Sequence, residues 1–136
     1  MSRWGFHIWC ESLPTVEVES GKIDLSKAKK LREVSFIIKQ ANIAWAIGMV
    51  ESITDQHRDL QKISIHFDTS FCIIIATASP QSRTNLDSNL PRLRKLLVNL
   101  ARLRPSLVIH VEALCTETGR MCEYIHDRFM DEMFCT

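Results

Sequence analysis

A segment from residue 25 to residue 53 carries apolar side chains at helical spacing on two opposite sides. At about 100° per residue, one broad face collects Leu31, Val34, Ile37, Ile38, Ala41, Trp45, Gly48 and Met49. The opposite side collects Phe36, Ile43, Ile47 and Val50. A helix that packs on one core needs a single apolar face, so another layer or another chain must cover the second. The pattern predicts one long helix with an additional contact surface.

Three shorter segments alternate between apolar and polar residues, as half-buried β-strands do. They are residues 4–10, residues 16–19 and the segment Lys62–Phe67. Pro14, which precedes the second segment, has no amide hydrogen to donate to a ladder. The second segment is therefore predicted to be an edge strand.

The region after residue 67 reads as a turn, a strand and a loop. Residues 68–70 have the composition of a hairpin loop. Residues 71–78 are apolar on both faces, which is typical of a central strand covered on two sides. Residues 79–89 are rich in Ser, Asn and Thr and predict a mobile loop.

A second helix is predicted to begin at Pro91, which suits a first helical turn, and to end before Pro105. Its apolar arc consists of leucines at positions 90, 93, 96, 97, 100 and 103. Residues 107–111 then alternate as a strand. Residues 118–134 place Met121, Tyr124, Ile125, Phe129 and Met133 at helical spacing, which predicts a final helix.

The resulting element order predicts a single α+β domain over residues 1–136, with a mostly antiparallel sheet and two or three packed helices. Without the second N-terminal strand, the order is that of a ferredoxin-like βαββαβ unit with a C-terminal helix. With that strand, the order is closer to the profilin-like, longin or roadblock group. Many unrelated proteins share either order, so the order does not indicate a function.

Composition and charge narrow the class of protein. The chain has 136 residues, 46% hydrophobic and 24% charged, which is typical of an ordered domain with its own core. A net charge of +1 means that any electrostatic binding must come from a local patch. No signal-peptide pattern opens the chain, and its longest uncharged run, residues 40–50, is too short to span a bilayer. The five cysteines lack a short repeating spacing, so we expect free thiols in the cytoplasm or nucleus.

A basic face is one candidate site. No acidic residue occurs between Asp87 and Glu112. Four cations gather around the side of the predicted helix opposite its leucines: Arg92, Arg94, Lys95 and Arg102. Such a face suits phosphate groups of nucleic acid or an acidic partner. It is more typical of an ordinary solvated helix face, whose cations also suit the helix dipole.

Metal and catalytic signals are weak. Cys122 and His126 lie four residues apart, a spacing that presents two zinc ligands on one helix face, but no short Cys-rich spacing completes the site. The four glycines are scattered, so there is no phosphate-binding glycine loop. No nucleophile and base are paired by their spacing. We predict no enzyme activity, no cofactor and no metal.

We therefore expect a small intracellular adaptor, a complex subunit that binds another protein chain, either itself or a different partner. Its contacts are predicted to come from the second apolar face and one N-terminal aromatic residue: Phe36, Ile43, Ile47, Val50 and Trp9. The alternative hypothesis is a nucleic-acid-binding module that uses the basic face near residues 91–104.

Overall fold

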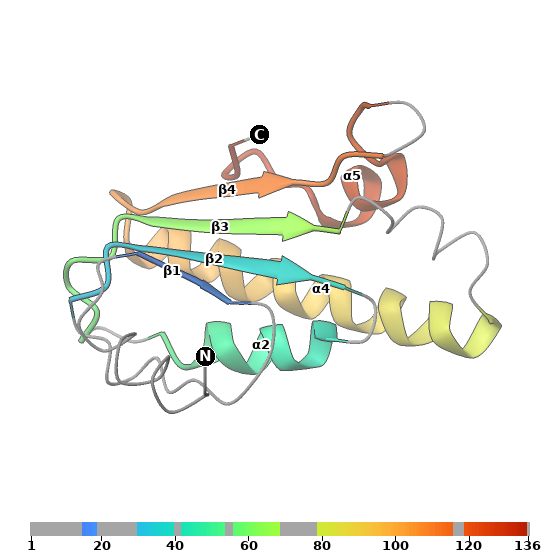
Figure 1. The fold of residues 1–136 in the computed structure, drawn as a ribbon, viewed down its shortest axis with the longest axis horizontal. Coiled ribbons are helices and arrows are strands. Elements are labelled where there is room, and N and C mark those ends of the chain that lie inside the picture. Colours follow the sequence, from blue (N-terminus) through green and yellow to red (C-terminus); the bar gives the residue numbers. More distant parts are fainter. Residues whose placement is uncertain are drawn as a thin grey trace.

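The computed structural model describes residues 15–18, 30–39, 42–53, 56–68, 79–115 and 119–135. Strands and helices alternate along most of this part of the chain (Figure 1). The elements are β1 (Thr15–Val18), β2 (Glu33–Ile38), α2 (Ile43–Glu51), β3 (Lys62–Phe67), α4 (Pro80–Leu103), β4 (Val108–Glu112) and α5 (Glu123–Phe129).

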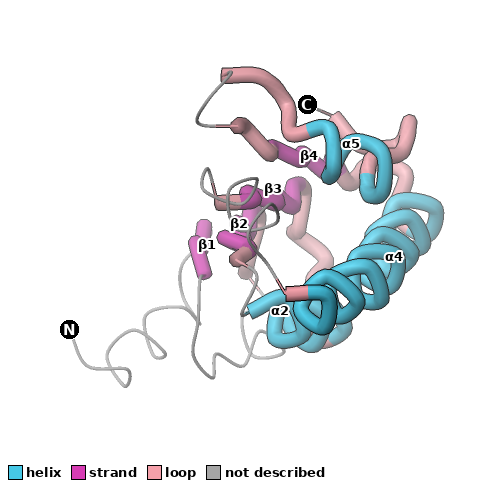
Figure 2. Tube along the Cα trace, turned by 90° about the vertical axis from the view of Figure 1, so that its right-hand side faces the viewer, coloured by secondary structure: helices cyan, strands magenta, loops and turns pink. Residues whose placement is uncertain are grey.

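The four strands form one sheet in the order β1-β2-β3-β4, and every neighbouring pair is parallel. Each strand therefore lies beside its predecessor in the sequence. Parallel neighbours need a crossover between them, which α2 supplies after β2 and α4 supplies after β3. Figure 2 shows these two helices on the same side of the sheet. The protein combines helices with a sheet as predicted, but the predicted antiparallel sheet is wrong, and with it the ferredoxin-like and profilin, longin or roadblock variants.

The predicted helix over residues 25–53 is the main source of that error. Its centre is strand β2, in which Val34, Phe36 and Ile38 are buried and alternate with half-buried neighbours. Asn42 separates this strand from α2. Its Oδ1 accepts the amide hydrogen of Lys39 at 2.7 Å, and its Nδ2 donates to the carbonyl of Ile37 at 2.9 Å. Such side-chain bonds to nearby backbone favour a turn over a continuous helix.

Other strand predictions are confirmed. β3 covers the predicted segment Lys62–Phe67, and β4 is displaced by one residue from the predicted 107–111. β1 lies at the edge of the described sheet, as Pro14 led us to expect. The predicted strands at residues 4–10 and 71–78, and residues 69–70 of the predicted hairpin loop, lie outside the described residues.

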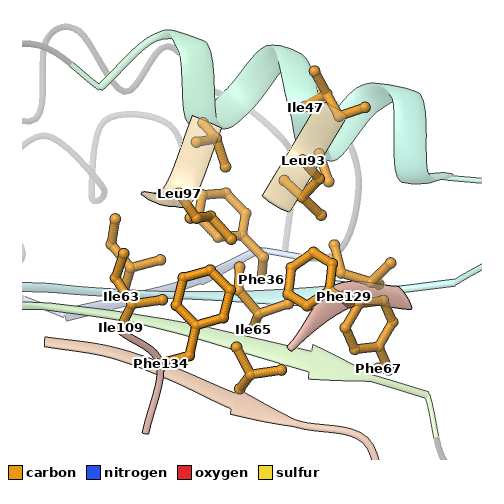
Figure 3. Packing of buried hydrophobic residues seen from close by; sticks show 14 of the residues in the cluster. Phe36, Ile47, Ile63, Ile65, Phe67, Leu93, Leu97, Ile109, Phe129 and Phe134 are labelled. Carbon is orange, nitrogen blue, oxygen red and sulfur yellow. The ribbon is translucent and has the colours of Figure 1, made fainter. Parts of the chain in front are cut away.

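The core lies between the helices and one face of the sheet (Figure 3). The strands contribute Phe36, Ile63, Ile65 and Ile109, while α2 and α4 contribute Ile47, Leu93 and Leu97. Burying this apolar surface is the main stabilisation of the fold. Within the predicted leucine arc, positions 90, 93 and 97 are buried and positions 96 and 100 pack partly buried against the core. Leu103, at the end of the arc, is 77% exposed.

The C-terminal region closes one end of this core. The predicted helix over residues 118–134 is shorter than expected, because α5 covers only Glu123–Phe129. The ring of Phe129 packs 5.3 Å from that of Phe67 and 5.7 Å from that of Phe134. Cys135 then pairs with β4: its amide donates to Ile109, and its carbonyl accepts from Val111, each at 2.8 Å. Cys135 thereby covers part of the outer edge of β4.

Candidate nucleic-acid interface

Helix α4 is much longer than its sequence indicated. The predicted loop at residues 79–89 is wrong: those residues from Pro80 onward are helical, and Pro91 lies inside the helix instead of opening it. The buried residues Leu86 and Leu90 continue the apolar arc into this half, so tertiary packing sets the helical state. The hydroxyls of Thr84 and Ser88 each donate at 2.9 Å to the carbonyl four residues earlier, which keeps them within the helical ladder.

One side of α4 faces solvent along the whole helix. We call this side the exposed stripe, and its eight residues, all exposed, are Gln81, Thr84, Asn85, Ser88, Arg92, Lys95, Asn99 and Arg102. They follow the i, i+3 and i+4 spacing of a single helix face. A helix of this length extends about 36 Å. The stripe contains three cations and no carboxylate, with uncharged amides and hydroxyls in its first half and positive charge in its second.

Arg94 is the predicted basic residue that does not belong to the stripe. Its Nη2 lies 2.6 Å from Oδ2 of Asp131, in the segment that follows α5. The two side chains are 41% and 17% exposed, so the pair lies at the protein surface. Arg94 therefore holds two parts of the protein together, and three of the four predicted basic residues remain on the solvent side of α4.

A carboxylate beside the stripe is held by α5. Asp87 accepts a hydrogen bond from the hydroxyl of Tyr124, and its Oδ1 lies 3.4 Å from Nε of Arg128. The Arg128 guanidinium also lies over the Tyr124 ring, 3.9 Å from its centroid. Burial, together with the hydrogen bond and charge of Asp87, raises the pKa of Tyr124 to about 12. These contacts direct the charge of Asp87 toward α5 and away from the stripe.

The predicted protein-docking residues lie elsewhere. Phe36, Ile43, Ile47 and Val50 are between 0% and 3% exposed and belong to the protein's own core. Trp9 lies outside the described residues. Phe36 belongs to a strand and the other three to a short helix, so the two-sided helix on which the docking hypothesis rested does not form. These four side chains offer no surface to a partner in this structure.

The face of the sheet opposite the helices carries a small cluster of titratable side chains, two histidines and one glutamate. His66 Nδ1 lies 3.2 Å from Glu112 Oε2, and the rings of His66 and His110 are 6.4 Å apart. In parallel sheets, ligands often bind near the carboxyl ends of the strands, where His66 and Glu112 lie. Ser64 lies opposite His110 in the β3–β4 pairing, but among the described residues no hydrogen bond joins a nucleophile to either imidazole, so this face gives no arrangement that identifies a reaction.

The structure also tests the zinc hypothesis. Cys122 is buried and disulfide-bonded, so it has no thiolate for a metal, and the expectation of free thiols fails for this residue. His126 Nδ1 lies 3.5 Å from Asp127 at the surface. Across the described residues, no group of three or more His, Cys, Asp or Glu side chains is placed to hold a metal ion.

None of the helices in the described ranges combines the length and apolar character that crossing a membrane requires. Comparison of the chain with protein-family models, with curated proteins and with solved structures gave no match.

Proposed function

We propose that this protein binds double-stranded nucleic acid through contacts between the exposed stripe of α4 and the phosphate backbone. The observation that carries this proposal is the placement of Arg92, Lys95 and Arg102 on one exposed helix face that lacks carboxylates. None of the three forms an ion pair with a carboxylate of the described residues. Their charges are thus available to an external anion.

The chemistry of the whole stripe suits a phosphate backbone. Arg and Lys neutralise phosphates, while the Asn and Gln side-chain amides donate hydrogen bonds to phosphate and sugar oxygens. From Arg92 to Arg102 the helix rises about 15 Å, which spans several phosphates of one strand. The remaining polar positions, Gln81 to Ser88, extend the same surface without adding negative charge.

A duplex fits this surface better than a single strand. Proteins that bind single strands without sequence preference stack the bases on aromatic side chains. The exposed stripe contains no aromatic residue, and the groups that it presents are charges, amides and hydroxyls along one helix. Such a surface matches the regular backbone of a double helix. The adaptor hypothesis has no comparable support, because its four described contact residues are enclosed in the core.

Fluorescence anisotropy with a labelled DNA duplex of about 20 base pairs tests the proposal across about 50 to 200 mM salt. Three phosphate contacts predict that log K falls with log salt with a slope of about −2.7. The triple variant Arg92→Gln, Lys95→Gln, Arg102→Gln should abolish this binding. The double variant Lys30→Gln, Arg32→Gln is the control, because it removes exposed cations outside α4 and should retain the slope.

Two results would overturn the proposal. One is an absence of binding by the wild type at the lowest salt concentration. The other is a slope that the triple variant leaves unchanged, since the cations responsible would then lie elsewhere. Circular dichroism of each variant confirms that the fold is retained, because Gln is a good helix former at exposed positions.

A further inference from the structure

We infer that the N-terminal half of α4 enters the major groove of double-stranded DNA, where Gln81 and Asn85 contact the edges of adenine bases. This inference rests on the proposed function and extends it from backbone binding to base contact. It depends on three features of residues 80–90: their position relative to the sheet, the chemistry of the stripe there, and the distance to the first cation.

The first feature is position. Figure 1 shows α4 continuing past the carboxyl ends of β2 and β3, so that its N-terminal half extends beyond the strands. An α-helix fits the major groove of B-DNA, whose width is about 12 Å. The side chains that would meet the groove floor, Gln81, Thr84, Asn85 and Ser88, are all exposed and line a shallow hollow on the helix surface. The opposite side of the same segment is fixed to the protein by the buried Leu86 and Leu90.

The second feature is the pair of side-chain amides. Gln81 and Asn85 are four residues apart, so they lie on one face about 6 Å apart along the axis. Each amide presents one donor and one acceptor side by side, which matches the N6 amino group and N7 of adenine. Asn89 Nδ2 donates to Asn85 Oδ1 at 3.0 Å. This bond fixes the Asn85 amide, and its own NH₂ group stays available for N7 of a base.

The third feature is the spacing between amides and cations. Arg92 follows Asn85 by seven residues, which places it about 10 Å farther along the helix. That distance is close to the width of the major groove, so a helix whose first half lies in the groove brings Arg92 to the flanking phosphates. Lys95 and Arg102 then follow the backbone outside the groove. The uncharged and cationic halves of the stripe thereby have separate roles, base contact and backbone contact.

A DNA duplex of alternating A·T pairs, compared with the same duplex carrying 7-deazaadenine, tests the base contact directly. The analogue replaces the N7 acceptor with C–H in the major groove and leaves the backbone and minor-groove edge in place. We expect the wild type to bind the parent duplex at least fivefold more tightly at equal salt, about the effect of one good amide–adenine pair. The salt slope should be the same for both duplexes, because the phosphate contacts are unchanged.

The variant Gln81→Ala, Asn85→Ala should lose this preference and keep the salt slope. Asn99→Ala is the matched control, since it removes the same kind of amide from the same stripe in the cationic half, and it should keep the preference. Salt-dependent binding of both duplexes with equal affinity would overturn the base contact and leave the proposed function standing. Loss of all binding by the wild type would instead reject the proposed function itself.

Discussion

Arg94 and Asp131 form a 2.6 Å ion pair that joins the middle of α4 to the segment after α5. Asp131 also accepts the amide hydrogen of Met133 at 3.1 Å, which organises the turn that leads to the buried Phe134. The pair therefore supports the position of the C-terminal segment against the core. It also divides the basic residues of α4 into one with an internal partner and three that face solvent.

This division predicts opposite effects for two neighbouring arginines. Arg94→Gln should lower the free energy of unfolding by about 1 kcal/mol, because it leaves the carboxylate of Asp131 without its partner. It should leave the salt slope of duplex binding unchanged. Arg92→Gln should reduce that slope by about 0.9 and change stability by less than about 0.5 kcal/mol. Urea unfolding and anisotropy titrations on both variants measure the two effects.

The opposite result would show that the roles given to Arg92 and Arg94 are wrong. If Arg94→Gln reduces the salt slope as much as Arg92→Gln does, the ion pair opens on binding and Arg94 belongs to the interface. The double variant Arg94→Gln, Asp131→Asn separates the contributions, because removing both partners should be less destabilising than the sum of the single changes.

The raised pKa of Tyr124 predicts that the folded protein loses stability at alkaline pH. Its pKa is raised from 10.0 to about 12 in the folded protein, so the folded state favours the neutral phenol more than the unfolded chain does. This stabilisation is complete below pH 10 and is lost as the pH rises from 10 to about 12. Relative to Tyr124→Phe, the wild type should therefore lose about 1 kcal/mol across this range, a value reduced for the solvent contact of the Asp87 pair.

The chain contains a single tyrosine, so its phenolate absorbance reports this site alone. An absorbance titration of the folded protein should give a midpoint near 12, and the urea-unfolded protein a midpoint near 10. Asp87→Asn should lower the folded midpoint, because it removes the charge that opposes the phenolate. A folded midpoint near 10 in the wild type would show that Tyr124 does not form the Asp87 hydrogen bond in solution.

The spacing of apolar residues predicted an element correctly where it fitted only one periodicity, that of a strand or that of a helix. Lys62–Phe67 alternates strictly, and β3 forms there. In β2 the same residues fit two periods, because Val34 and Ile38 are four apart and also alternate with half-buried neighbours. Because α2 follows with helical spacing, the helical period appeared to continue without a break from β2 into α2. The parallel sheet then escaped prediction, since its β2–α2–β3 crossover had been merged into one helix.

The candidate site was predictable in part for a similar reason. The cations at positions 92, 95 and 102 share a face in any helix that contains them, so their grouping could be read from spacing alone. The contact of Arg94 with Asp131 joins residues 37 positions apart and has no local signal. The polar half of the stripe was missed because Ser, Thr and Asn have low helix propensity and Pro91 suggested a helix start. The signal that remained was the pair Leu86 and Leu90, four residues apart and in phase with Leu93 and Leu97.

The length of α4 leads to a final prediction, in which two proline changes have opposite effects. Pro91 inside the helix has no amide hydrogen for the carbonyl of Asp87, and its ring crowds that carbonyl. Pro91→Ala should therefore raise the free energy of unfolding by about 1 to 3 kcal/mol and increase the helical circular dichroism signal. Asn85→Pro should lower the free energy of unfolding by about 3 kcal/mol, because it interrupts the helix between Pro80 and the buried Leu86.

The matched change Asn85→Ala keeps the helix and should alter stability by less than about 0.5 kcal/mol, apart from the loss of the Asn89 contact. If α4 instead began at Pro91, neither proline change would have the effect on stability that is expected above. Pro91→Ala would then be neutral or destabilising, since proline is favoured in a first helical turn, and Asn85→Pro would be tolerated in a loop. Urea unfolding of the three variants thus decides whether residues 80–90 form the rigid helix that base contact requires.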